Sequence, residues 1–450
     1  MTSNWFYYCF TLLTATFILS SCLNSDSDNI DYTVSRDAQI TSLSISSRED
    51  SSRVLSKVKF SIDQVSSAPL IFNKDSLPYL FDISNALLQI KTNNASGIKL
   101  HLFNPDSSYI WDQTDSVMIK KLNQIEIFAE DGITTKRYTF KLNTHQQDPD
   151  TIFWQSVAED YIPQPNDQVT VSNKDSFFTY YKLNNSIHLS TSPIDNGDDW
   201  TYTQINGLPQ NVILKTIQND SFDNGENWYA LDDGNNVYYS ENGENWSMLT
   251  TSYPVKAIFG KLPSFTEDEI LTIIEKDGSH MFAKTKDFSS INVLNNMPEG
   301  FPIKDFTSTT ISDSLNYTAK YLIVTGGQDI NDTSNKEVWL LQEGANNNIT
   351  YAHQLLDFNV EGSTLFRYDD KIYLLTSEKN RNVFYTSTNY GAFWKKASNK
   401  QSLPLEYASR ENQSVNIDDK NNIWIFGGQT SDKTQLIEVW RGRINKLFIK

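Results

Sequence analysis

The sequence predicts an all-β protein in which a β-sandwich is followed by a β-propeller of about six blades. Three observations support this prediction. Aromatic residues make up 13% of the 450 residues, and Gly, Asn, Asp and Ser gather in short clusters between apolar runs. No long stretch has the i, i+3, i+4, i+7 apolar spacing of an amphipathic helix. A turn pattern ending in Trp also recurs through the C-terminal two thirds of the chain.

The first residues predict an exported lipoprotein. Residues 6–19 form an apolar run that is too short to cross a membrane as a helix and fits the hydrophobic part of a signal peptide. The run ends in Leu19-Ser20-Ser21-Cys22, which resembles the lipobox of bacterial lipoproteins. That resemblance implies a signal peptide at 1–21 and lipidation of Cys22. An ordinary signal peptide with an incidental Cys is the alternative, and the lack of Lys or Arg in residues 1–10 departs from the usual signal.

We expect residues 22–32, which are polar and acidic, to form a flexible tether after the predicted anchor. An acidic run at this position resembles the surface-export signals of lipoproteins in anaerobic Gram-negative bacteria. We therefore expect a lipid anchor in the outer membrane, with the protein exposed at the cell surface. The chain has two Cys, Cys9 in the signal and Cys22, so the mature protein would have neither a disulfide nor a Cys-based metal site.

The formal net charge of −17 belongs entirely to the exported part, because residues 1–22 contain no Asp, Glu, Lys or Arg. A strongly acidic surface repels phosphate backbones, and no basic cluster offsets it. We therefore expect no nucleic-acid partner. The charge favours solubility of an exported protein.

Residues 33–146 predict a sandwich of roughly seven strands, because short runs alternate apolar and polar residues. The clearest hairpin is Ile125–Phe140, where Asp131-Gly132 supplies the turn and Ile125 and Ile127 point to one face of the strand. The hairpin resembles the last strands of bacterial Ig-like or cadherin-like domains. Segments 60–64 and 72–79 also resemble a lipoprotein family of unknown function with an N-terminal sandwich and a C-terminal propeller. For Asp75 and Tyr79 within them, a turn and a core role are favoured over ligand binding.

Residues 150–450 predict the propeller, after a linker at Asp148-Pro149-Asp150. Asp195-Asn-Gly-Asp-Asp-Trp200 and Glu241-Asn-Gly-Glu-Asn-Trp246 share the same spacing, and Asn389–Trp394 repeats it after Ser387. This resembles the Asp-box that closes hairpins in sialidase-like propellers. The side chain five residues before the Trp is expected to accept backbone N–H bonds, and the Gly to take a positive φ.

The spacing of these turns matches one four-stranded blade. Glu241 follows Asp195 by 46 residues, and Asp287 follows by 46 more in a degenerate copy without Gly and Trp. The further copy at Ser221–Trp228 lies too close to Trp246 to start another blade, so we interpret it as a loop between strands.

A second repeat pairs two Gly with a later Trp. Gly326-Gly327 precedes Glu337-Val-Trp339, and Gly427-Gly428 precedes Glu438-Val-Trp440, 101 residues on, about two blades. This pattern resembles kelch blades. The repeats together predict blades at 171–208, 211–252, 255–297, 303–354, 359–400 and 404–448. Residues 152–157 are expected to pair with the last blade and close the ring; a seventh blade is the alternative.

The sequence contains no complete catalytic motif. Sialidases need an arginine triad to grip a carboxylate, and no Arg occurs between Arg137 and Arg367. A two-carboxylate glycosidase stays open, because acids are plentiful. The most prominent of them, however, lie in predicted turns: Asp232, Asp233, Asp369 and Asp370.

The sequence also predicts neither a metal nor a cofactor. The five His (His101, His145, His188, His280 and His353) lack metal-ligand spacing, and the loop at Asp220–Gly225 fails as a calcium loop because Phe222 and Leu231 occupy ligand positions.

The sequence therefore favours a non-catalytic binding or scaffold module with a glycan or protein ligand at a propeller mouth. The alternative is a glycan-active hydrolase or lyase, and a third class is a structural factor of the envelope. Aromatic loops at propeller mouths stack on sugars or grip peptides. Tyr180, Tyr181, Tyr368 and Tyr390 are candidates for this role, although core packing is favoured for each.

Overall fold

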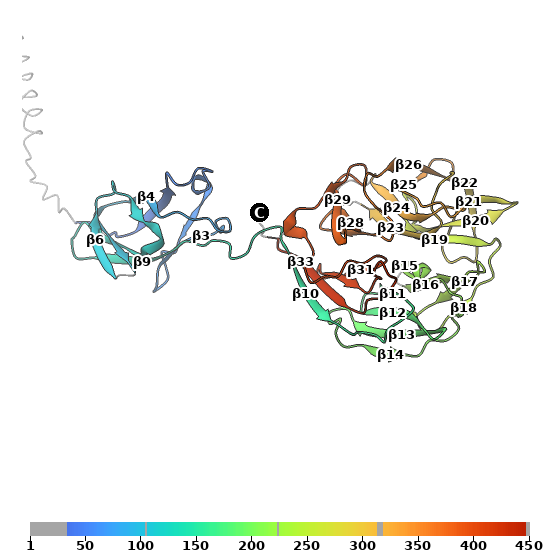
Figure 1. The fold of residues 1–450 in the computed structure, drawn as a ribbon. Coiled ribbons are helices and arrows are strands. Elements are labelled where there is room, and N and C mark those ends of the chain that lie inside the picture. Colours follow the sequence, from blue (N-terminus) through green and yellow to red (C-terminus); the bar gives the residue numbers. More distant parts are fainter. Residues whose placement is uncertain (1–33, 104–105, 223–224, 313–317, 447–450) are drawn as a thin grey trace, which may run out of the picture. The chain divides into compact units, whose positions relative to one another are not determined.

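The structure is a computed structural model that describes residues 34–103, 106–222, 225–312 and 318–446 (Figure 1). In these residues every regular element is a strand or a short 3₁₀ turn, which confirms the predicted all-β class. The 3₁₀ turns are η2 (Leu55–Lys57), η3 (Ile119–Lys121), η4 (Leu214–Thr216) and η5 (Asn399–Gln401). The described residues hold no helix long and apolar enough to cross a membrane. The predicted signal peptide, Cys22 and the tether lie outside the described residues.

The chain forms two compact units, with the boundary along the sequence between Gln147 and Asp148. The described residues of the first unit form nine strands in two sheets, against the roughly seven predicted. One sheet has the order β1 (Ile40–Ser46), β4 (Asn85–Thr92), β7 (Val117–Met118). The other has the order β2 (Phe60–Ile62), β3 (Leu70–Asn73), β9 (Thr135–Lys141), β8 (Leu122–Ala129), β5 (Ala95–Leu102), β6 (Ser107–Trp111). Both sheets contribute buried side chains to one core, as in a β-sandwich.

The predicted hairpin of this unit is formed by β8 and β9, with Phe128 paired to Thr135. Asp131 Oδ1 accepts hydrogen bonds from the N–H groups of Ile133 and Thr134, and Gly132 has a φ of 66°. Ile125 and Ile127 are fully buried in the core, as the alternation predicts.

The described residues of the second unit form six four-stranded sheets arranged around an axis as blades (Figure 1). Blade 1 contains β11 (Asp167–Ser172), β12 (Ser176–Leu183), β13 (Ser186–Pro193) and β14 (Thr201–Thr203). Blade 2 contains β15 (Gln218–Phe222), β16 (Gly225–Leu231), β17 (Val237–Ser240) and β18 (Ser247–Met248). Blade 3 contains β19 (Val255–Leu262), β20 (Glu269–Lys276), β21 (Ser279–Thr285) and β22 (Asn292–Asn296).

Blade 4 contains β23 (Lys304–Ser312), β24 (Lys320–Gln328), β25 (Glu337–Gly344) and β26 (Asn348–Leu355). Blade 5 contains β27 (Thr364–Tyr368), β28 (Lys371–Glu378), β29 (Arg381–Ser387) and β30 (Lys395–Lys396). Blade 6 contains β31 (Ser414–Ile417), β32 (Ile423–Phe426), β33 (Val439–Ile444) and β10 (Ile152–Ala158). The first strand of each blade lies nearest the axis (Figure 1).

The ring is closed by β10, the earliest strand of the unit, which pairs antiparallel with β33 of the last blade. Trp154 lies opposite Gly442, where an added Cβ would come 2.5 Å from the indole ring. The predicted closure is therefore confirmed and the seven-blade alternative is wrong, because β10 supplies the fourth strand of blade 6.

The hydrophobic cores of this unit lie between neighbouring blades. Trp228 and Trp246 of blade 2 pack with Tyr180 of blade 1, while Trp339 of blade 4 packs with Leu271 of blade 3. Each blade buries its faces against two neighbours, so a single blade has no core of its own. This arrangement explains why the aromatic repeats recur at blade spacing.

The Trp turns are closed by a different side chain from the one predicted. In blade 2, Asn242 Oδ1 accepts from the N–H groups of Glu244 and Asn245 at 3.0 Å, and the Trp246 indole N–H donates to the Gly243 carbonyl. Asn196 plays the same part in blade 1, where its Oδ1 accepts from the Asp198 N–H. The predicted acceptors Asp195 and Glu241 are therefore wrong. In blade 2 the N–H of Gly243, two residues after Glu241, donates to Ser240 Oγ at 3.0 Å instead.

The other two turns keep the predicted acceptors. Asn389 Oδ1 accepts from the Phe393 N–H at 3.0 Å, in a turn that is one residue longer. Asp287 Oδ1 accepts from the Ser289 N–H at 3.0 Å, with Phe288 at a φ of 62° in the place of the Gly. Asp287 therefore corresponds to Asn242, and this step is one residue shorter than the predicted 46. For the copy at Ser221–Trp228, β15 and β16 pair as a hairpin, and residues 223–224 lie outside the described chain.

The paired Gly residues lie where backbones approach closely. Gly327 has a φ of 74°, and an added Cβ would lie 2.2 Å from the Lys304 carbonyl oxygen. Gly427 has a φ of 55°, and an added Cβ there would lie 2.5 Å from the side-chain amide of Gln168. A side chain at either position would displace an innermost strand or a residue beside the axis.

Candidate functional site

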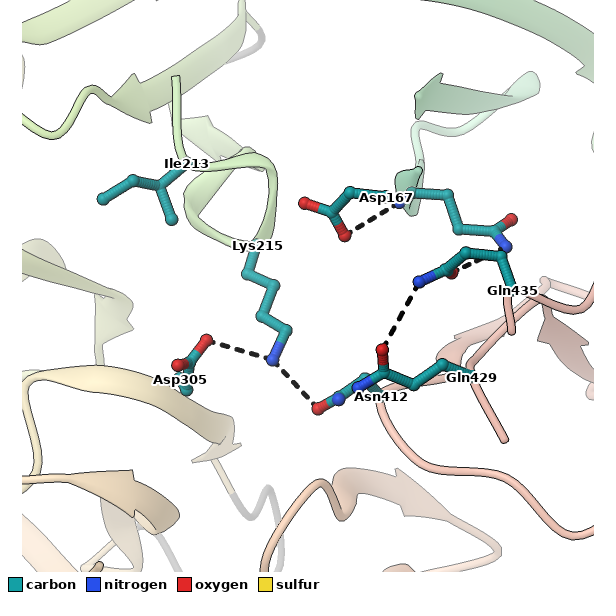
Figure 2. A pocket seen from close by; sticks show the side chains of 8 residues that line it. Asp167, Ile213, Lys215, Asp305, Asn412, Gln429 and Gln435 are labelled. Carbon is teal, nitrogen blue, oxygen red and sulfur yellow. Dashed lines mark hydrogen bonds and ion pairs between the residues drawn. The ribbon is translucent and has the colours of Figure 1, made fainter. Parts of the chain in front are cut away.

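A polar cavity of about 230 Å³ opens at one mouth of the propeller, where the innermost strands begin (Figure 2). Asp167 begins β11 and Asp305 lies near the start of β23, while Lys215 and Asn412 precede β15 and β31. Because the first strands of all blades run in the same direction, their starts gather at this end of the axis. The cavity is lined by Asp167, Gln168, Ile213, Lys215, Asp305, Asn412, Gln429 and Gln435.

Lys215 links three alternate blades at this mouth. The turn η4 carries it between blades 1 and 2, and its Nζ donates to Asp305 Oδ1 at 3.0 Å and to Asn412 Oδ1 at 2.9 Å (Figure 2). The side chains of Lys215 and Asp305 are 31% and 56% exposed. An ion pair this exposed contributes at most about 1 kcal/mol, so a polar ligand can replace it at low cost.

Asp167 supplies a second carboxylate to the cavity. Its Oδ1 accepts from the Gln168 N–H at 2.9 Å (Figure 2). Burial raises the pKa of Asp167 and the Asp305 charge adds to the rise, while the Gln168 N–H and the charges of Lys215 and Lys182 oppose it. Two acids therefore face one cavity in different environments, and neither is among the turn acids considered from the sequence.

A chain of side-chain amides forms the remaining polar wall. Gln168 Nε2 donates to the Leu436 carbonyl at 2.7 Å and to Gln435 Oε1 at 3.2 Å, and its Oε1 accepts from the Tyr161 hydroxyl at 2.6 Å. Gln435 Nε2 in turn lies 3.5 Å from Gln429 Oε1 (Figure 2). These bonds fix the orientation of the amides before any ligand arrives, which lowers the entropic cost of binding.

The tyrosines considered as ligand contacts do not line this cavity. Tyr180, Tyr181 and Tyr368 are at most 3% exposed and pack between blades. Tyr390 is half-buried against Tyr321, with ring centroids 5.6 Å apart. The favoured core role is therefore confirmed for the first three, and packing between blades 4 and 5 accounts for Tyr390.

The turn acids lie where the sequence predicts. Asp232 Oδ1 accepts from the Asn236 N–H at 2.8 Å, and Asp233 binds the Asn211 amide. Asp369 and Asp370 have φ values of 51° and 55° in the β27–β28 turn. Each of these acids serves a local turn or pair. The described residues contain no group of three His, Cys, Asp or Glu that would hold a metal ion.

No motif in the sequence marks Lys215, Asp305 or Asn412, whose side chains make the central contacts of the cavity. Lys215, Asp305 and Asn412 lie in three blades, at different offsets from the repeat motifs. Their one shared feature is that each lies at or just before an innermost strand. The starts of these strands gather at one mouth of the propeller.

Two family models match the chain. The DUF6242 N-terminal domain, a domain of unknown function, matches residues 23–142, and the DUF6242 beta propeller domain matches residues 148–450. None of the curated proteins compared with the chain matches it.

Several solved structures are similar to it. A DUF4623 family protein from Bacteroides eggerthii has 10% identity and a TM-score of 0.39, with 91% of this chain and 99% of that chain covered. The fucose-specific lectin from Aleuria aurantia has 10% identity and a TM-score of 0.40 (63% and 97% covered). YjhT has 9% identity and a TM-score of 0.42 (63% and 95% covered). These values are too low to transfer a function.

Proposed function

The chain belongs to the DUF6242 family, which combines an N-terminal domain of unknown function with a C-terminal β-propeller, and we propose that it is a non-catalytic module that binds a small neutral sugar at the propeller mouth. The observation that carries this proposal is the polar cavity around Lys215. Its amide, carboxylate and ammonium groups come from blades 1, 2, 4 and 6 and face one space (Figure 2).

The size and chemistry of the cavity favour a sugar over a protein ligand. A volume of about 230 Å³ lies below the range of roughly 300–1,000 Å³ typical of drug-sized ligands, so the site suits a single sugar residue. Planar amides and carboxylates bind adjacent hydroxyl groups with paired hydrogen bonds. Ile213, 41% exposed at the rim, offers an apolar contact for the C–H face of a sugar ring.

A hydrolase is the second candidate, and the Asp167–Asp305 pair is the observation in its favour. Burial raises the pKa of Asp167, as a general acid requires, while Asp305 lies next to Lys215. We favour binding because polar groups from four blades surround the cavity, which suits the hydroxyl groups around a sugar ring. In a glycosidase, the Asp305 carboxylate would have to reach the anomeric carbon or activate a water.

The binding proposal is tested by calorimetric titration of the purified protein with a panel of neutral monosaccharides. We expect one sugar to bind and Asn412→Ala to weaken it at least about tenfold, a loss of about 1.4 kcal/mol. Lys400→Met, in an exposed ion pair elsewhere in the propeller, is the control and should bind as the unmodified protein does. Unchanged binding by Asn412→Ala would refute the mouth site. Hydrolysis of a glycoside that disappears in Asp167→Asn would favour the second candidate.

We further propose that Cys22 carries a lipid that anchors the protein in the outer membrane, facing the cell surface. The support is the sequence Leu19-Ser20-Ser21-Cys22 after a short apolar run. Cys22→Ala should move the protein from the membrane fraction to the soluble fraction, and accessibility to protease added to whole cells tests the outward orientation. Unchanged fractionation of Cys22→Ala would remove the anchor from the proposal.

A further inference from the structure

A second cavity, of about 560 Å³, lies at the opposite end of the innermost strands from the mouth cavity. Its main wall is the loop 263–268, which follows the end of β19, whereas the mouth cavity lies where the innermost strands begin. Blade 2 contributes Tyr239 and blade 4 contributes Lys320. This volume falls in the range of sites that hold a drug-sized ligand.

Three lysines line this cavity together with three carboxylates, Glu267, Asp268 and Asp287, in a protein with a net charge of −17. Lys261 Nζ lies 3.5 Å from Asp268, and Lys286 Nζ lies 2.6 Å from Glu267. Lys320 Nζ donates to the Ser264 carbonyl. The loop 263–268 thus presents its own oxygen atoms to all three ammonium groups.

These contacts are exchangeable. The Lys286–Glu267 pair is 56% and 55% exposed, and the Lys261–Asp268 pair is 34% exposed on each side. Each exposed pair contributes at most about 1 kcal/mol. A ligand carboxylate can therefore take the place of a loop carboxylate without unfolding the loop.

An aromatic surface lies beside the ammonium groups. Phe265, on the same loop, is 54% exposed, and the Lys320 ammonium lies 5.6 Å from its ring centroid. Tyr239 is held in place by its hydroxyl, which donates to Asn227 Oδ1 at 3.1 Å. An exposed aromatic ring in a charged surrounding matches a ligand that has an apolar face and an anionic group.

We propose that this cavity binds an acidic sugar, a saccharide that contains a uronic acid. The sugar ring packs on Phe265, and its carboxylate binds Lys320 and Lys286 in place of Glu267. A long polyanion is disfavoured because the acidic protein repels it outside the cavity. The site is independent of the mouth cavity and makes a different selection, because its three ammonium groups balance three carboxylates, whereas the mouth lining has one ammonium group and two carboxylates.

The test is calorimetric titration of the full-length protein with a uronic-acid disaccharide, its methyl ester and its sulfated neutral counterpart. We expect the acid to bind at least about tenfold more tightly than the ester, and its affinity to fall between about 50 and 300 mM salt. Phe265→Ala and Lys320→Met should each weaken binding of the acid by about tenfold or more.

Matched controls separate the site from general effects. Phe393→Ala removes a 66% exposed Phe in blade 5, and Lys400→Met removes an exposed ion pair, so both should bind the acid normally. If Lys320→Met fails to fold, Lys286→Met takes its place. The proposal is overturned by equal binding of acid and ester, by equal binding of the sulfated sugar, or by normal binding in the cavity variants. Neutral-sugar binding at the mouth should persist in Phe265→Ala, which distinguishes the two sites.

Discussion

Lys215 Nζ lies 3.0 Å from Asp305 Oδ1, and this contact joins the second blade of the propeller to the fourth at its mouth. The same ammonium group donates to Asn412 of the sixth blade. Blades that are not adjacent in the ring thus meet in one polar cluster. The cluster requires blades 2, 4 and 6 to face one axis, in a ring that β10 closes by pairing with β33.

Lys215→Met should abolish sugar binding at the mouth while lowering the stability of the protein only slightly. The ion pair is partly exposed, so we expect the free energy of unfolding to fall by at most about 1 kcal/mol. Lys304→Met, which removes another exposed pair, should have the same small effect. Sugar binding at the mouth should be lost only in Lys215→Met, as measured by calorimetry. A loss of several kcal/mol on denaturation by urea would show that the cluster holds the ring together instead.

Gly243→Ala should destabilise the protein far more than Gly278→Ala. Both residues have a positive φ (74° and 75°), which costs an Ala about 1–2 kcal/mol. At Gly243 an added Cβ would also lie 2.8 Å from the Tyr180 hydroxyl, whereas at Gly278 it would meet nothing within 4 Å. We expect an additional loss of about 1–3 kcal/mol at Gly243, measured by urea unfolding. Equal losses of stability in the two variants would mean that the packing around Gly243 accommodates the added methyl group at little cost.

Arg410→Met should be strongly destabilising because Arg410 is 1% exposed and its guanidinium donates three hydrogen bonds. Its guanidinium donates to Glu438 at 2.6 Å and to the Gly427 carbonyl at 3.1 Å, and lies 4.1 Å from the Tyr407 ring centroid. Removing one partner of a fully buried pair costs about 3–5 kcal/mol, and because the Glu438 side chain is 27% exposed we expect a loss of about 3 kcal/mol, at the lower end of that range. Lys420→Met, which removes an exposed pair, is the control and should cost less than about 1 kcal/mol.

The double variant Arg410→Met/Glu438→Gln should recover part of that loss. Glu438 lies beside a second donor, the Trp440 indole N–H at 2.9 Å, which a Gln oxygen can still satisfy. Removing the unpaired charge relieves its desolvation cost. A double variant as unstable as Arg410→Met alone would show that the lost stability comes from the packing of the Arg410 guanidinium on Tyr407.

Asp220→Asn should stabilise the protein at high pH. Burial raises the pKa of Asp220 to about 6, against the opposing charge and backbone N–H of Lys261. Among the described residues, its Oδ2 is buried without a hydrogen-bond partner. A folded-state pKa above the unfolded value gives the protein stability below about pH 4 that it loses as pH rises through about 6.

The advantage of Asp220→Asn over the unmodified protein should therefore grow between about pH 4 and pH 8, by about 3 kcal/mol at most. Urea unfolding at several pH values measures this difference. Asp160→Asn serves as a control for general effects of charge, because Asp160 is exposed at the surface of the same unit. A difference that stays constant with pH would contradict the titration of Asp220.

The sequence was sufficient for the all-β class, the six blades and the closing strand. These features depend on local signals: turn residues such as Asp131 and Gly243, alternating strands, and aromatic residues that recur because every blade packs against the next. The error of one position at Asp195 and Glu241 arose because Asp, Glu and Asn alternate in these turns. Only hydrogen-bond geometry distinguishes Asn196 and Asn242 as the capping residues.

The candidate sites were decided by the tertiary structure alone. Asp167, Lys215, Asp305 and Asn412 are separated by up to 245 positions and share no motif, so nothing along the chain marks them as neighbours. Closure of the ring brings the starts of the innermost strands to one mouth, and packing between blades buries Tyr180 and Tyr368 instead of leaving them for a ligand. Local chemistry thus specified the repeat, whereas the convergence of its loops required the closed ring.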